Sequence, residues 1–342
     1  PGQLLQVGFH GTTVPGDLRE LIFAGRVGGV TLFSRNLRDP EQALALTQEL
    51  HACAPPDLPL LISIDQEGGR VQRLREPWTC WPAMRSVGER GDVAATQAIA
   101  TALAVELADL GIGLNFAPVV DVDTRPDNPV IGDRSFARTP ERVAQLACAF
   151  IEKLQAGGVA ACAKHFPGHG DTHLDSHLDL PCVDHPLDRL RRVELHPFQA
   201  AARAGVASMM TAHIVFPALD RKRPATLSPS VLGLIRDDLG YDGVVWSDDL
   251  EMGAVAKHFD VRTRVLGSLE AGVDGLLICS QADLRNEALA YVERAPDNLV
   301  ENPLRRVIAL KQAYATARRL APEHKPKGPP YPDHQALARE LA

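Results

Sequence analysis

The stretch VAACAKHFPGHGDTHLDSHLDLP, Val159 to Pro181, joins a short apolar run to a segment rich in histidine and aspartate. Seven further apolar runs recur along the chain: LLQVGF, GGVTLF, PLLISID, IGLNFAPVVDV, VASMMTAHI, GVVWSD and GVDGLLICS. Continuous apolarity, rather than alternation, is typical of strands that are buried on both faces of a parallel sheet. We therefore predict eight parallel strands.

Amphipathic stretches separate these runs and predict helices. Several begin with Asp or Thr at a capping position and end with Gly, which are the expected start and stop signals. They are DPEQALALTQELHAC, DVAATQAIATALAVELADLG, TPERVAQLACAFIEKLQAGG and HPLDRLRRVELHPFQAAARAG. Each stretch is interpreted as helical.

Eight strands that alternate with helices predict an α/β fold, a (β/α)8 TIM-type barrel in a single domain. A doubly wound open sheet is the alternative, and it is disfavoured because no GxGxxG fingerprint follows the first strand. We expect the barrel to occupy residues 1–320. Residues 321–342 are interpreted as a Pro-rich connector and a short C-terminal helix.

The composition of the chain indicates which kinds of partner and which cellular compartment to expect. The 342 residues carry a net charge of −7 without a basic arm, which argues against nucleic-acid and anionic membrane partners. Six cysteines are scattered without a CxxC pair, as is typical of reduced thiols. No cationic, apolar leader is evident and no apolar run approaches about 18 residues. We expect a cytoplasmic monomer.

Polar clusters follow three of the predicted strands. LLISID continues into DQEGGRVQR, VAACAKHF into PGHGDTHLDSH, and GVVWSD into DLEMGA. Active sites of barrels are built at the carboxyl ends of the strands, so these clusters are expected to meet there.

The histidine-rich segment has two interpretations. Its four histidines are spaced four residues apart: His165, His169, His173 and His177. This period places ligands on one face only of a helix, and Pro167, Gly168 and Gly170 interrupt a helix here. A loop can still ligate a metal ion, so a metal-dependent hydrolase stays open beside a loop that transfers protons.

Asp175 and His177 form an Asp-x-His pair, in which a carboxylate can orient an imidazole and stabilise its protonated form. Asp248 and Asp249 end the seventh predicted strand. Because adjacent residues of a strand point to opposite sides, we expect only one aspartate to face the barrel mouth and the other to cap the next helix. Asp248 and His177 could serve as the nucleophile and proton donor of a retaining glycosidase.

Four ordered motifs together resemble glycoside hydrolase family 3: SIDQEGGRVQRL, NPVIGDRSF, KHFPGHGDTHLDSH and WSDDLEMGA. The chain is most similar to the single-domain bacterial β-N-acetylglucosaminidases of cell-wall recycling. The resemblance extends from about Gln3 to Ala315. It implies a TIM-type barrel and a retaining exo-glycosidase that needs no cofactor and no metal.

The resemblance also implies residue roles. Asp248 would be the nucleophile, His177 the acid/base and Asp175 its partner. The residues that would bind the sugar are Asp65, Arg73, Arg134, Lys164 and His165. The pattern assigns no role to Asp171 or His173.

The implied substrate is a small carbohydrate, the non-reducing terminal β-N-acetylglucosamine of peptidoglycan fragments (muropeptides). A neutral histidine repels an anionic acceptor less than a glutamate does, so phosphorolytic cleavage of the same bond is an alternative to hydrolysis. A sugar-binding protein without activity is a further alternative, which the presence of both Asp248 and His177 disfavours.

Overall fold

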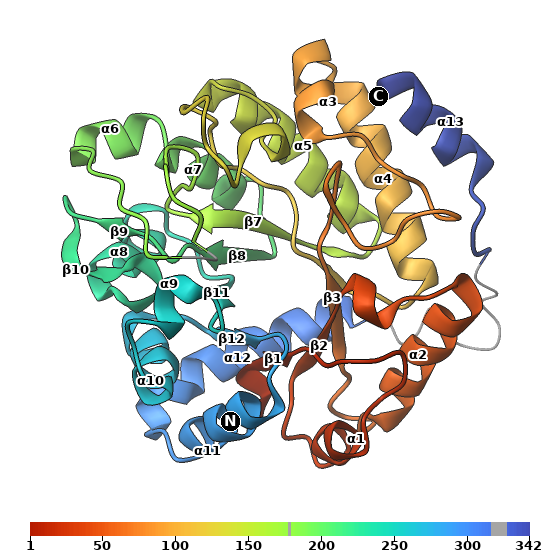
Figure 1. Ribbon diagram of the computed structural model, residues 1–342, viewed down its shortest axis with the longest axis vertical. Coiled ribbons are helices and arrows are strands. Elements are labelled where there is room, and N and C mark those ends of the chain that lie inside the picture. The colour runs from red at the N-terminus through yellow and green to blue at the C-terminus, as the bar shows by residue number, and fades with distance from the viewer. Residues whose placement is uncertain (177–178, 316–326) are drawn as a thin grey trace.

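The computed structural model describes residues 1–176, 179–315 and 327–342. Its centre is a closed barrel of parallel strands in the order β1-β12-β11-β8-β7-β6-β3-β2 (Figure 1). The strands are β1 (Leu5–Val7), β2 (Gly29–Leu32), β3 (Leu61–Ile64), β6 (Leu114–Asn115), β7 (Ala160–Phe166), β8 (Ser208–Thr211), β11 (Val244–Asp249) and β12 (Gly275–Ile278). All eight coincide with the predicted runs, and the predicted (β/α)8 class is confirmed.

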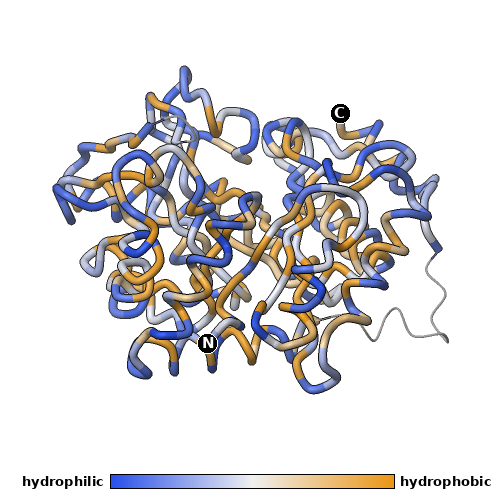
Figure 2. The backbone as a smooth tube through the Cα atoms, turned by 60° about the horizontal axis from the view of Figure 1, so that its bottom comes forward, coloured by the Kyte–Doolittle hydropathy of each residue, from blue (hydrophilic) through white to orange (hydrophobic). Residues whose placement is uncertain are grey.

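The barrel closes through β1, which pairs with β12 at Leu5 and Leu276 and with β2 at Val7 and Val30. This closure excludes the open-sheet alternative. Every residue of the barrel strands is buried except the last two of β11. The hydropathy of the backbone shows the same division, with apolar segments inside and hydrophilic loops outside (Figure 2). Burial on both faces thus explains the continuous apolar runs.

Helices surround the barrel. They are α1 (Gly16–Phe23), α2 (Pro40–Cys53), α3 (Met84–Arg90), α4 (Val93–Asp109), α5 (Pro140–Ala156), α6 (Leu187–Arg192), α7 (Leu195–Arg203), α8 (Pro229–Gly233), α9 (Gly253–Ala256), α10 (Val261–Ala271), α11 (Ala282–Glu293) and α12 (Asp297–Tyr314). The predicted caps are observed at Asp39, which accepts the N–H of Gln42, and at Asp92, which accepts that of Ala95, whereas the Thr139 side chain does not cap α5. Side-chain caps satisfy backbone donors that a helix start leaves unpaired.

The helical stretch predicted over residues 185–205 forms two helices, α6 and α7. Pro197 lies in the first turn of α7. A proline ring clashes with the carbonyl four residues earlier, here that of Val193, so one helix cannot continue through both. Glu194 lies at the resulting break.

The described residues also form two antiparallel hairpins outside the barrel sheet. In one, β4 (Gln66–Gly68) pairs with β5 (Val71–Gln72), and in the other, β9 (Val215–Phe216) pairs with β10 (Asp220–Pro224). The first follows β3 directly. Gly68 and Gly69 take φ values of 106° and 56°, which residues with a Cβ rarely adopt. They turn the chain so that Glu67 and Arg73 return to the end of β3.

The C-terminal helix α13 (Pro332–Leu341) packs beside α4 (Figure 1). Tyr331 donates a hydrogen bond of 3.0 Å to Asp109, and His334 Nδ1 lies 2.8 Å from Glu106 Oε1. The predicted boundary at residue 320 and most of the expected connector lie outside the described residues.

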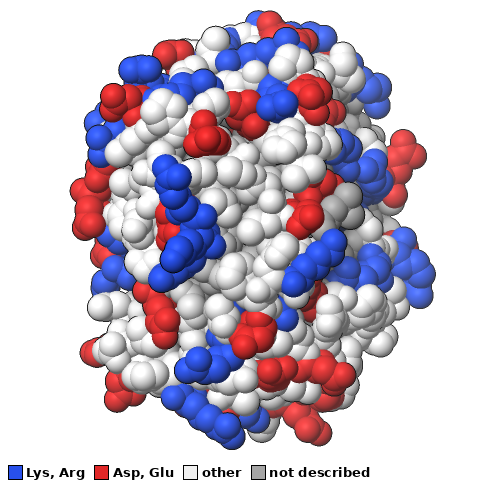
Figure 3. Space-filling view, turned by 60° about the vertical axis from the view of Figure 1, so that its left-hand side comes forward, with Lys and Arg blue, Asp and Glu red and all other residues white. Residues whose placement is uncertain are grey.

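All six cysteines are free thiols. Among the helices of the described ranges, none combines the length and apolarity that crossing a bilayer requires. Basic and acidic side chains are interspersed over the face seen in Figure 3. That face therefore carries no large field of one sign.

Candidate active site

A pocket of about 280 Å³ opens at the carboxyl ends of the barrel strands. Six of the eight predicted site residues line it: Asp65, Arg73, Arg134, Lys164, His165 and Asp248. Asp175 is described but does not line the pocket, and His177 lies outside the described residues. Its neighbour Ser176 lines the pocket. The volume is at the lower limit for small-molecule sites, which suits one sugar unit rather than an extended chain.

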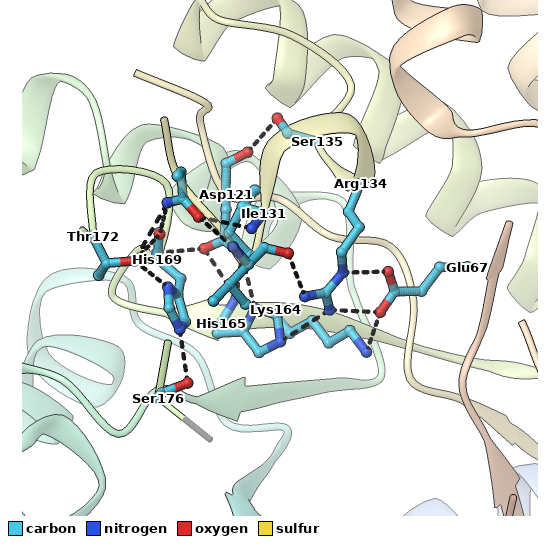
Figure 4. A network of polar contacts seen from close by, with 12 residues as sticks. Glu67, Asp121, Ile131, Arg134, Ser135, Lys164, His165, His169, Thr172 and Ser176 are labelled. Atoms are coloured by element: carbon cyan, nitrogen blue, oxygen red, sulfur yellow. Dashed lines mark hydrogen bonds and ion pairs between the residues drawn. The ribbon is translucent and has the colours of Figure 1, made fainter. Parts of the chain in front are cut away.

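Lys164 lies between two carboxylates of this pocket, and Figure 4 shows it beside Glu67 and Arg134. Its ammonium lies 2.8 Å from Asp65 Oδ1 and 2.6 Å from Glu67 Oε1. Arg134 forms two parallel hydrogen bonds to Glu67, of 2.8 and 2.9 Å, and Arg73 lies 3.1 Å from Asp65. The wall therefore alternates fixed positive and negative charges.

These neighbours determine the ionisation of the two carboxylates. Burial opposes ionisation of Asp65, but the charges of Lys164 and Arg73 outweigh it and hold its pKa well below the ordinary value. Burial likewise opposes ionisation of Glu67, yet Arg134 and Lys164 lower its pKa to about 2. Burial would lower the pKa of Lys164, and the two carboxylates raise it instead. All three groups are charged at neutral pH.

Exposure separates the roles of the two acids. The side chain of Glu67 is 2% exposed and that of Asp65 is 17% exposed. Glu67 accepts from both Arg134 and Lys164, so it positions these cations. Asp65 faces the pocket and can accept hydrogen bonds from a ligand's hydroxyls.

The segment NPVIGDRSF carries Arg134 into the site. Asn128 Oδ1 accepts the backbone N–H groups of Val130 and Ile131, and its Nδ2 donates to the carbonyl of His169 at 2.9 Å. This one amide therefore shapes the turn before Arg134 and ties it to the histidine-rich loop.

A buried aspartate organises the start of that loop. Asp121 accepts the backbone N–H of His165 at 3.1 Å and that of His169 at 2.7 Å. The ring Nδ1 of His165 donates to the same carboxylate at 2.8 Å. This bond fixes the ring, so its Nε2 is directed toward the pocket, 3.5 Å from Arg134. The β7–β8 ladder also shifts register between Lys164 and Phe166, where Lys164 and His165 both reach the pocket.

His169 is a buried structural histidine. Its Nδ1 lies 2.8 Å from Thr172 Oγ1 and its Nε2 lies 3.0 Å from Ser176 Oγ. Burial and the neighbouring His165 lower its pKa to about 4, so the ring is neutral. With both nitrogens bonded to hydroxyls, His169 holds the loop instead of sharing a metal ion with His165.

The expectation that only one aspartate of β11 faces the pocket was wrong, because Asp248 and Asp249 both line it. The β11–β12 ladder shifts register between Trp246 and Asp249, which breaks the strict alternation of sides. Asp249 accepts the N–H of Glu251 and does not cap α9. Burial, followed by the charges of Glu251 and Asp248, raises the pKa of Asp249 to about 7.

Three participants were missed by the sequence analysis: Glu67, Asp121 and Asp249 as a pocket residue. Glu67 stands two residues after Asp65, and alternate residues of an extended segment share a side. Asp121 interrupts an apolar run, where a charge needs a partner. The sequence thus indicated that Glu67 and Asp121 matter, but it did not identify the residues that they contact.

Comparison with known proteins agrees with this architecture. The model of the glycosyl hydrolase family 3 N-terminal domain matches residues 1–310. The chain belongs to glycosyl hydrolase family 3. This family 3 chain is 41% identical over 318 residues to β-hexosaminidase A of Pseudoalteromonas piscicida, a match that covers 86% of this chain and 53% of that enzyme. It thus spans about half the length of that relative.

Two solved structures are similar over 99% of the chain. One is a β-N-acetylglucosaminidase from Paenibacillus sp. FPU-7, with a TM-score of 0.92, 41% identity and 67% of its chain covered. The other is NagZ from Neisseria gonorrhoeae in complex with N-trifluoroacetyl-D-glucosamine, with a TM-score of 0.82, 34% identity and 98% of its chain covered. The match thus covers nearly the whole of that NagZ chain and about two thirds of the Paenibacillus enzyme.

Proposed function

We propose that this chain is a retaining exo-β-N-acetylglucosaminidase that removes the terminal sugar from peptidoglycan fragments through a glycosyl-aspartate intermediate. The observation that carries the proposal is the meeting of Asp248 with the Lys164–Asp65–Arg73 wall in one small pocket. The relatives named β-hexosaminidase and β-N-acetylglucosaminidase support the choice of sugar.

Binding would use the charged wall. An ammonium has three N–H donors and an aspartate has several lone pairs, so Lys164 and Asp65 can each bond a sugar hydroxyl while bonding each other. Arg73 and Arg134 add donors on either side. His165 is held by Asp121 and presents its Nε2 to the pocket. These groups would orient the ring so that its anomeric carbon faces Asp248.

The chemistry would then take two steps. Asp248 attacks the anomeric carbon while protonated His177 gives its proton to the departing glycosidic oxygen. Neutral His177 next removes a proton from water, which hydrolyses the glycosyl ester with net retention. Asp175 would orient His177. Ser176 stands between them, lines the pocket, and its carbonyl accepts the N–H of Ala254 after β11, which supports delivery of this loop to Asp248.

The test is covalent trapping with 5-fluoro-β-N-acetylglucosaminyl fluoride, intact-mass analysis and peptide mapping. The expected result is one sugar per chain on the peptide that contains Asp248, with none on Asp248→Asn. An adduct on Asp249, or turnover without any adduct and with inverted product in NMR, would refute the assignment.

Separate experiments test which molecule accepts the sugar, water or phosphate, and which leaving group the enzyme prefers. Turnover in phosphate buffer that yields N-acetylglucosamine 1-phosphate would establish phosphorolysis instead of hydrolysis. Comparison of kcat/KM on a muropeptide and on a chitin disaccharide would test the peptidoglycan assignment, which predicts the higher value for the muropeptide. Turnover abolished by a chelator and restored by a metal ion would favour the metal-dependent alternative.

A further inference from the structure

Asp171, His185 and Glu194 form a cluster outside the substrate pocket, on the side of the barrel where α6 and α7 pack (Figure 1). Asp171 follows β7 in the histidine-rich loop, His185 precedes α6, and Glu194 lies at the break before α7. One side-chain donor atom from each lies within 4.8 Å of the others. His185 Nε2 already contacts Asp171 Oδ2.

The side chain of Glu194 gives an independent indication of a binding site. Its side chain is only 3% exposed, and Oε1 accepts a hydrogen bond of 3.0 Å from Arg189. Its second oxygen, Oε2, is buried and has no hydrogen-bond partner among the described residues. A buried carboxylate oxygen without a partner is costly and rare, so it indicates a group that binds there.

We propose that Asp171, His185 and Glu194 bind a divalent transition-metal ion, Zn²⁺ by the nature of the donors. One imidazole and two carboxylates are accepted zinc ligands, and the two negative charges match the ion. Ligand bonds of about 2.0–2.2 Å in a tetrahedron place donor atoms about 3.4 Å apart. Small side-chain rotations bring the cluster to this spacing, and water takes the fourth position.

Arg189 fits this site as an outer partner of a ligand. Carboxylates that ligate a metal are commonly held by hydrogen bonds from surrounding groups, which orient the ligating oxygen. Arg189 holds Oε1 of Glu194 and leaves Oε2 without a hydrogen-bond partner among the described residues. Glu194 also packs against the start of the loop, since a Cβ added to Gly168 would lie 2.8 Å from the Cβ of Glu194. The cluster therefore lies close to the end of β7.

The ion would fasten the loop at its base. Asp171 lies four residues before Asp175, so coordination anchors the start of the loop to α7. None of its three ligands lines the sugar pocket, so the ion takes no part in bond cleavage. Binding at this cluster is therefore independent of the proposed glycosidase function, and failure of one does not affect the other.

The experiment is metal titration of the chelator-stripped full chain. Isothermal titration calorimetry with Zn²⁺ should give one site per chain, and Co²⁺ should give the intense visible absorption of a tetrahedral complex. His185→Gln and Glu194→Gln should each weaken Zn²⁺ binding by at least about 100-fold, since removal of a ligand exceeds the 10–100-fold loss on removal of its outer partner.

Controls separate this cluster from other histidines. His334→Gln breaks a similar histidine–carboxylate contact, between α13 and Glu106 of α4, and should leave the Zn²⁺ affinity unchanged. His177→Ala should also retain it, which distinguishes the cluster from the catalytic loop. Hydrogen exchange should show that Zn²⁺ slows the amides of residues 169–176 in the wild type and not in Glu194→Gln, with unchanged melting of both metal-free proteins as the check on folding.

Absence of Zn²⁺ and Co²⁺ binding below millimolar concentration would overturn the proposal. The same holds if His177→Ala abolishes binding while His185→Gln retains it, because the ion would then lie at the catalytic loop.

Discussion

Asp249 is a carboxyl group whose folded environment favours the protonated form, and this makes stability depend on pH in a defined direction. Burial is the largest cause of its raised pKa, followed by the charges of Glu251 and Asp248. In the unfolded chain its pKa is near the ordinary value of 3.8, and in the folded chain it is about 7. Below pH 3.8 both states are protonated and Asp249 contributes no pH dependence.

Between these two pKa values the unfolded state is ionised while the folded state keeps its proton. Stability therefore falls as the pH rises through this range, and the full loss is present above pH 7. Between pH 5 and pH 8 the loss of stability accumulates over about two pH units, up to the folded pKa. At about 1.36 kcal/mol for each unit, the free energy of unfolding falls by ~3 kcal/mol. Asp249 is partly exposed to the pocket, and screening by its water reduces this to about 1.5 kcal/mol.

The perturbation is Asp249→Asn, which keeps the shape and removes the titration. We expect urea unfolding to show that the wild type loses about 1.5 kcal/mol more than this variant between pH 5 and pH 8. Asp39→Asn is the control. The pKa of Asp39 is lowered, chiefly by the N–H of Gln42, so it stays ionised across this window. Its effect should be equal at the two pH values. An equal effect of Asp249→Asn at both would refute the reasoning.

Three further predictions follow from contacts of the described residues. Glu67→Gln should lower kcat/KM on p-nitrophenyl β-N-acetylglucosaminide by roughly 10²-fold and lower the free energy of unfolding by ~3 kcal/mol, because Arg134 loses its buried partner; unchanged values would remove Glu67 from the site. Asp248→Ala should lower kcat by roughly 10⁴-fold and form an α-glycosyl azide when azide is added, whereas a β-azide would contradict covalent retention. Gly88→Ala should destabilise, since its Cβ would lie 1.7 Å from a backbone carbonyl, while Gly267→Ala, which meets only ordinary contacts, should stabilise α10 by about 0.5–1 kcal/mol in thermal melts; equal effects would refute the packing argument.

The barrel was predictable because its cause is local. A strand that is buried on both faces must be apolar throughout, and this pattern can be recognised within a short stretch of the sequence. The exceptions were also local in origin but concerned geometry. Pro197 ended a helix inside one amphipathic stretch, and the register shift near Asp249 turned two adjacent side chains to the same pocket. Alternation is a rule for regular strands, and strand ends at active sites are often irregular.

The site was less predictable because its contacts are long-range. The Glu67–Arg134 bonds join residues 67 positions apart, and Lys164 reaches Asp65 across 99. Residue types indicate that a buried acid needs a cation, but several cations are available in the sequence. Only the order of strands around the barrel decides which of them stand opposite.

Stability alone does not account for the cluster of Glu67, Arg134 and Lys164. Buried ion pairs often contribute less than well-packed apolar side chains of similar volume, because the desolvation of each charge offsets their attraction. What such a cluster supplies is a set of donors and acceptors already fixed for the ligand, with no reorganisation on binding. When a bound sugar lacks the matching hydroxyl, a hydrogen-bond acceptor of Asp65 or a donor of Lys164 has no partner. Discrimination against deoxy sugars should therefore exceed the ~1 kcal/mol of one ordinary hydrogen bond, since the loss includes the cost of buried charges without their partners.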